Sequence, residues 1–167
     1  MVGSIHAVDS DSHCHRAHKP RVAEIKAIFL SLEVGGEKTL FILLSEDGTI
    51  NRMGNGQLSY PDRESLYMGR TTEPLFAKLR SHLTDDMLRY MGRYDAPKKV
   101  GEVCCFKIGL QFADGSANGF EIDYGSESDG RPQELVDFLH AALNVTDPWY
   151  RTFQNNRGPQ RGGLSQT

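Results

Sequence analysis

The stretch EVCCFKIGLQFADGSANGFEIDY, residues 102–124, carries the clearest structural pattern in this chain. Apolar side chains occupy every second position on either side of the turn sequence Asp114-Gly115-Ser116. Successive side chains of a strand point to opposite faces, so this alternation predicts an antiparallel hairpin with one buried face and one face near water. The apolar positions are Cys104, Phe106, Ile108, Leu110, Phe112, Phe120, Ile122 and Tyr124.

The other face of this hairpin is mostly polar. We expect Lys107 to lie opposite or diagonal to Glu121 or Asp123, where such pairs contribute about 0.2–1 kcal/mol each. Cys104 and Cys105 are neighbours, so they should point to opposite faces and make a poor redox pair. The chain has three cysteines, an odd number that favours a reducing compartment over a disulfide framework.

Four more strands are predicted upstream, over residues 24–34, 39–45, 49–53 and 66–70. They are apolar or β-branched segments bounded by turn-forming residues. Few polar positions interrupt Leu40–Leu44, so we expect this strand to be central, with both faces at least partly covered.

Two amphipathic segments predict helices. One begins near Thr72 as its N-cap, carries the apolar stripe of residues 75, 76, 79 and 83, and continues in a second helical piece up to residue 91. The other begins near residues 131–132, has a stripe with the same spacing at 135, 136, 139 and 143, and should end from Asn144 because Pro148 interrupts a helix.

These elements predict an α+β fold: a mostly antiparallel sheet of about five to six strands with two or three helices packed on one face. The repeated helix stripe leaves open an internal duplication, two β-β-α units in one sheet, although any core-facing helix has a similar spacing. We expect one domain over residues 21–153, a flexible His- and Ser-rich tail over 1–20, and a flexible Gly-, Gln- and Arg-rich tail over 154–167.

Charge and hydropathy exclude some classes of protein. The net charge is −3, and Arg151, Arg157 and Arg161 lie in a C-terminal stretch without acids, so the body of the chain is more acidic than the whole. An acidic body repels phosphate backbones, which argues against nucleic-acid binding. No apolar run reaches the roughly 18 residues of a membrane span, and the N-terminus lacks a signal-peptide core. We therefore expect a cytoplasmic protein that binds neither nucleic acid nor membrane.

A His-rich tract is the densest group of metal-ligating residue types. Imidazoles and a thiol are ligands for transition metals, but the tract lies in a segment without a core to orient them. We expect no cofactor, apart from adventitious binding of a transition metal to this tract. Its residues are His13, Cys14, His15 and His18.

None of the common nucleophile, phosphate-loop, dinucleotide or zinc-protease motifs occurs, and we assign no catalytic residue. This favours a non-catalytic binding or interaction module that uses an exposed sheet face or edge, with a second copy (a homodimer) or another protein as partner. The alternative is a small enzyme or ligand-binding domain with a pocket between sheet and helices. Its candidate ligand-binding residues are Arg52, Arg70, His82, Glu121 and Asp123.

Overall fold

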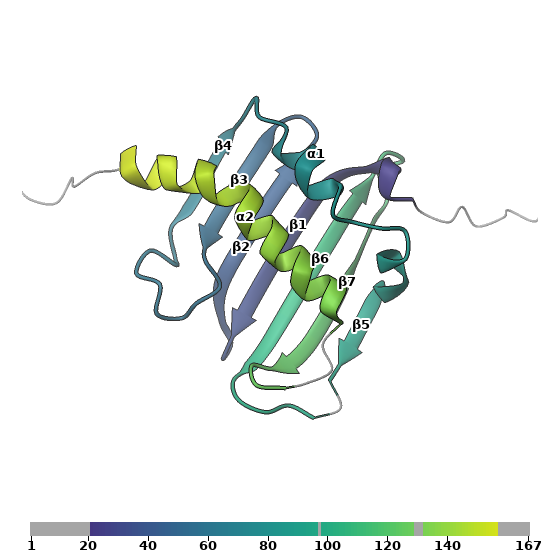
Figure 1. Ribbon diagram of the computed structural model, residues 1–167, viewed down its shortest axis with the longest axis vertical. Helices are drawn as coiled ribbons and strands as arrows, with labels where there is room; N and C mark the ends of the chain where they lie inside the picture. Colours follow the sequence, from purple (N-terminus) through teal and green to yellow (C-terminus); the bar gives the residue numbers. More distant parts are fainter. Residues whose placement is uncertain (1–20, 97, 129–131, 157–167) are drawn as a thin grey trace, which may run out of the picture.

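The fold is a single sheet covered by helices, seen in a computed structural model that describes residues 21–96, 98–128 and 132–156 (Figure 1). A short 3-10 helix, η1 (Val22–Glu24), precedes the first strand. The remaining elements, in chain order, are β1 (Ile25–Val34), β2 (Glu37–Ser45), β3 (Thr49–Gly54), β4 (Leu66–Arg70), α1 (Leu75–Arg80), the 3-10 helix η2 (Met87–Tyr90), β5 (Gly92–Asp95), β6 (Val103–Phe112), β7 (Ala117–Gly125) and α2 (Gln133–Asn156).

The strands form one seven-stranded sheet in the order β4-β3-β2-β1-β6-β7-β5. All neighbours are antiparallel except β5 and β7, which run parallel. The α+β class and the mostly antiparallel sheet are confirmed, but the expected strand number is too low. The strand missing from the prediction is β5, whose residues were expected to follow a helix end and form a linker.

The core lies between the sheet and the helices. In Figure 1, α1 and α2 both lie on the same face of the sheet, and α2 crosses it diagonally. The fully buried strand residues alternate along each strand, as Ile28, Leu30, Ile42 and Leu44 show, and they face Phe138 and the other buried residues of α2. Burial of this apolar area is the main stabilising term of such a layered domain.

The C-terminal helix is longer than predicted. It extends to Asn156 with Pro148 inside it, so the expectation that it ends from Asn144 is wrong. A proline removes one backbone hydrogen bond from a helix interior. Here the turns after Pro148 bury Trp149 and Tyr150 against the sheet, and that burial offsets the lost bond.

The two halves of the chain are not equal units. Four strands precede α1, which has six residues, whereas three strands, β5, β6 and β7, lie between α1 and α2, which has 24 residues. The helix predicted from Thr72 begins at Leu75, and its second piece is the 3-10 helix η2. The two segments thus share the spacing of their apolar stripes, but not the length of their helices or the number of strands before them.

No helix of the described residues combines the length and the apolar character that a membrane span requires.

Candidate interaction surface

The face of the sheet opposite the helices is the candidate functional surface, and we call it the open face. It carries the strand residues that alternate with the buried core positions. Among the described residues, no helix lies over it (Figure 1). Its two halves differ in chemistry: strands β1–β4 carry six large apolar side chains among polar ones such as Ser31 and Asn51, and strands β5–β7 carry most of the ion pairs.

Six apolar side chains form a contiguous group on the first half, which we call the apolar patch. Strand register places Phe29 beside Leu43, and places Met53 between Phe41 and Leu66. All six are half-buried or exposed. Single exposed apolar residues are ordinary, whereas a contiguous group marks a contact surface. The patch consists of Phe29, Phe41, Leu43, Met53, Leu66 and Met68.

The apolar patch was not predicted from the sequence. Leu40–Leu44 was predicted to form a central strand, and β2 does lie between β1 and β3. The strand was also predicted to have both faces at least partly covered; Phe41 and Leu43 are half-buried, and no described helix lies over them. The continuous apolar run of Leu40–Leu44 did indicate an apolar open face. A strand with one buried face and one solvated face would alternate apolar and polar side chains.

Phe29, the patch residue on β1, packs against a glycine of the neighbouring strand. Its ring lies over Gly109 on the neighbouring strand, where an added Cβ would be 1.6 Å from a ring carbon. Gly109 in turn pairs with Gly119 on β7. A glycine in a strand often marks the close approach of another group. Here it lets an aromatic ring lie flat on the sheet at the boundary between the two halves.

The second half of the open face carries a row of alternating charges. Lys107 lies opposite Glu121, as predicted, and their charged atoms are 3.6 Å apart. Arg93 on β5 donates a hydrogen bond of 2.7 Å to Asp123 and lies 3.8 Å from Glu121. The carboxylates on β7 are thus held between two cations from the neighbouring strands.

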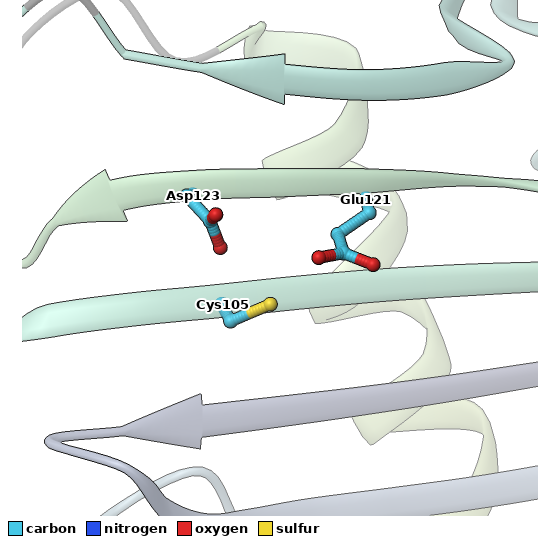
Figure 2. Close-up of side chains that lie close together, drawn as sticks. All are labelled: Cys105, Glu121 and Asp123. Atoms are coloured by element: carbon cyan, nitrogen blue, oxygen red, sulfur yellow. The ribbon is translucent and has the colours of Figure 1, made fainter.

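Cys105 lies beside these carboxylates (Figure 2). One ligand atom from each of Cys105, Glu121 and Asp123 falls within 4.8 Å of the others, a spacing that a metal ion would fit. Burial, with a hydrogen bond to Asp123, raises the pKa of the Cys105 thiol to about 12. A neutral thiol is a weak ligand and nucleophile. A cation here would also have to displace Arg93, so the arrangement is better described as an ion-paired row.

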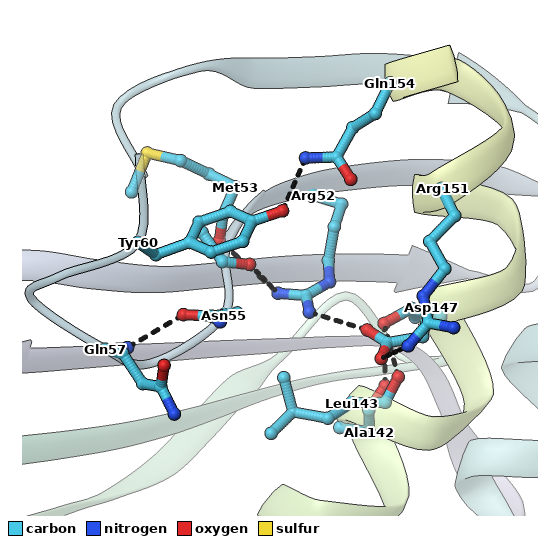
Figure 3. A network of polar contacts seen from close by, with 12 residues as sticks. Arg52, Met53, Asn55, Gln57, Tyr60, Ala142, Leu143, Asp147, Arg151 and Gln154 are labelled. Carbon is cyan, nitrogen blue, oxygen red and sulfur yellow. Dashed lines mark hydrogen bonds and ion pairs between the residues drawn. The ribbon is translucent and has the colours of Figure 1, made fainter. Parts of the chain in front are cut away.

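Arg52 is a buried structural residue of the core. It is fully buried on the helix side of β3, between the sheet and α2. Its guanidinium donates hydrogen bonds to the carbonyl oxygen of Gly54 at 2.6 Å and to Asp147 on α2 at 3.1 Å (Figure 3). It also lies 4.8 Å from the ring centre of Tyr150. Burial lowers the pKa of Arg52, but these partners hold it as a clamp between β3 and the helix.

The contacts around Arg52 extend into the loop between β3 and β4. Gln154, near the end of α2, donates a hydrogen bond to the Tyr60 hydroxyl at 2.6 Å (Figure 3). Tyr67 donates one to Asp62 at 2.5 Å. Burial raises the pKa of Tyr150, which packs against both tyrosine rings. This network fixes the C-terminal turns of α2 over the edge of the sheet.

The other candidate ligand-binding residues lie apart from one another. Arg70 is exposed at the end of β4 and pairs with Asp47 at 3.0 Å. His82 follows α1 and lines an open groove of about 500 Å³ with His140 of α2. Of the five residues named from the sequence, the structure brings together only Glu121 and Asp123. The His13, Cys14, His15 and His18 tract lies outside the described residues.

Models of known protein families and the sequences of curated proteins were compared with this chain, and neither comparison gave a match.

Proposed function

We propose that this chain is a non-catalytic interaction module that binds another protein surface through its open face. The observation that carries the proposal is the apolar patch, which joins four adjacent strands without a covering element among the described residues. Its centre, Phe41 and Leu43, is apolar and half-buried, as the core of a protein–protein interface is.

The charged row supports the same function. Ion pairs at the rim of an interface contribute mainly to specificity and association rate. Lys107 on β6 pairs with Ser31 of β1, and Glu121 follows it on β7, so both would meet a partner beside the patch. The neutral Cys105 thiol and the paired carboxylates do not favour acid–base or nucleophilic chemistry at this face.

The proposal is tested with the full chain as bait and two variants. Phe41→Thr/Leu43→Thr replaces the centre of the patch with residues that favour strands. Gln111→Thr is the control, an exposed substitution on the same face outside the patch. A protein captured by the native chain is purified, and its affinity for each variant is measured by titration calorimetry. We expect the double variant to bind about tenfold more weakly or worse, and the control to bind like the native chain.

Circular dichroism must first show that both variants keep the native fold. Equal affinities for the native chain and the folded double variant would refute an interface at the open face.

A further inference from the structure

The strand β4 forms one edge of the sheet. It is the last strand of the sheet and pairs only with β3, so its other side carries unpaired backbone groups among the described residues. Proteins protect such edges with lysine, proline, bulges or covering elements. Between Leu66 and Arg70 there is neither lysine nor proline, and the pairing with β3 has no register shift. By contrast, the opposite edge strand, β5, carries Arg93 and Asp95 among its four residues.

Apolar side chains flank this edge on both faces of the sheet. Leu66 is exposed on the open face, and Met68 beside it is 68% exposed. On the helix face, the exposed ring of Phe153 lies 3.6 Å from the position that a Cβ of Gly69 would take. Figure 1 shows the end of α2 running past β4. A strand added beside β4 would therefore meet apolar groups above and below it.

The residue pattern of the edge is complementary to itself. Glu64, Leu66, Met68 and Arg70 read acid, apolar, apolar, base at every second position. Glu64 lies in the turn before β4, 3.9 Å from Arg63, and lines a hollow with Met53, the open-face residue that pairs with Leu66. The side chains of Glu64 and Arg70 are 87% and 71% exposed.

An antiparallel pair of two such edges, centred on Tyr67, places Leu66 opposite Met68 of the second copy. It also brings Glu64, which lies two residues before β4, to the end of the partner strand that carries Arg70. The pair has the twofold symmetry of an isologous dimer, so each contact occurs twice. The two Gly69 residues are then roughly 13 Å apart along the strands, at 3.3 Å per residue. That spacing accommodates the ends of both α2 helices side by side, because helices pack about 8–10 Å apart.

We propose that the partner is a second copy of this chain, joined through β4 into one continuous sheet. The proposal rests on the proposed function, since it makes β4 and the border of the apolar patch the interface. Charge complementarity and the apolar flanks favour self-pairing over addition of an unrelated peptide. Such a peptide would have to carry the same order of acidic, apolar and basic side chains.

The test exchanges the charges. Glu64→Arg and Arg70→Glu each turn both ion pairs of the dimer into like-charge pairs, whereas a mixture of the two variants restores both attractive pairs. Sedimentation equilibrium of the full chain should show a dimer for the native protein and dimers about tenfold or more weaker for each variant alone. An equimolar mixture, and the double variant Glu64→Arg/Arg70→Glu, should recover the native dissociation constant.

Met68→Lys is a further variant that tests the edge without touching Arg70 and its pair with Asp47; it should also weaken the dimer. A native chain that is monomeric at all concentrations would overturn the inference, as would a dimer that is unchanged by all three single variants. A monomer that still binds another protein through Phe41 and Leu43 would overturn this inference alone and leave the proposed function standing. A chain that keeps the β4 dimer but does not bind another protein through Phe41 and Leu43 would overturn the proposed function and leave this inference standing.

Discussion

Replacement of Arg52 by alanine is expected to destabilise the fold strongly, because this residue joins β3 to α2 from a fully buried position. The substitution removes a charged hydrogen bond to the Gly54 carbonyl, worth about 1.5–3 kcal/mol. It also removes the contact with the Tyr150 ring, worth about 1 kcal/mol, and leaves unfilled space. Release of the buried guanidinium offsets part of this loss. We expect a net decrease of about 2–4 kcal/mol in the free energy of unfolding.

Urea unfolding, followed by circular dichroism and by the fluorescence of Trp149, measures this decrease. Arg151→Ala is the matched control: it removes the other arginine that pairs with Asp147, at 3.5 Å, but its side chain is exposed on α2. The control should cost less than about 0.5 kcal/mol. Equal effects of Arg52→Ala and Arg151→Ala would refute the assignment of Arg52 as a buried clamp.

Three other results are expected. Gly109→Ala should cost about 1–2 kcal/mol, because the Phe29 ring must move, and Phe29→Ala should reduce that cost in a double-mutant cycle. Hydrogen bonds from Cys105 and Arg93 lower the pKa of Asp123, so its contribution to stability is present above its unfolded pKa of about 3.9 and is lost as the pH falls through the lower folded value. Unfolding measured between about pH 5 and pH 2 should therefore be less pH-dependent for Asp123→Asn than for the native chain. At pH 8, well below the Cys105 pKa of about 12, iodoacetamide should label Cys105 about a hundredfold or more slower than an unfolded control; equal rates would contradict a half-buried, neutral thiol.

Alternation predicted the hairpin of β6 and β7, and apolar or β-branched content between turn-forming residues predicted the strands upstream. The predicted ranges 66–70 and 49–53 agree with β4 and β3 within a residue. β5 was missed because its four residues are all exposed and show no such alternation. The position of β5 depends on its parallel pairing with β7, and the residues of β5 alone carry no information about that distant partner.

The candidate site was less predictable than the fold. Arg52 was named as a ligand-binding residue at a hairpin end, yet it shares the buried face of β3 with Ile50. Side chains two residues apart in a strand lie on the same face, so the apolar Ile50 could have indicated that Arg52 is buried. The apolar patch had a weaker signal: Phe41 was visible as apolar, but its neighbours Met53 and Leu66 are known only once the register of three strands is known.

The position of β1 has a consequence for synthesis of the chain. β1 lies between β2, its immediate successor, and β6, where Ile25 pairs with Phe112. As the polypeptide leaves the ribosome, β1 and β2 emerge well before β6, which completes the second side of β1, and α2 follows last. Apolar surface is therefore exposed during translation, and nascent chains in that state depend on chaperones to avoid aggregation.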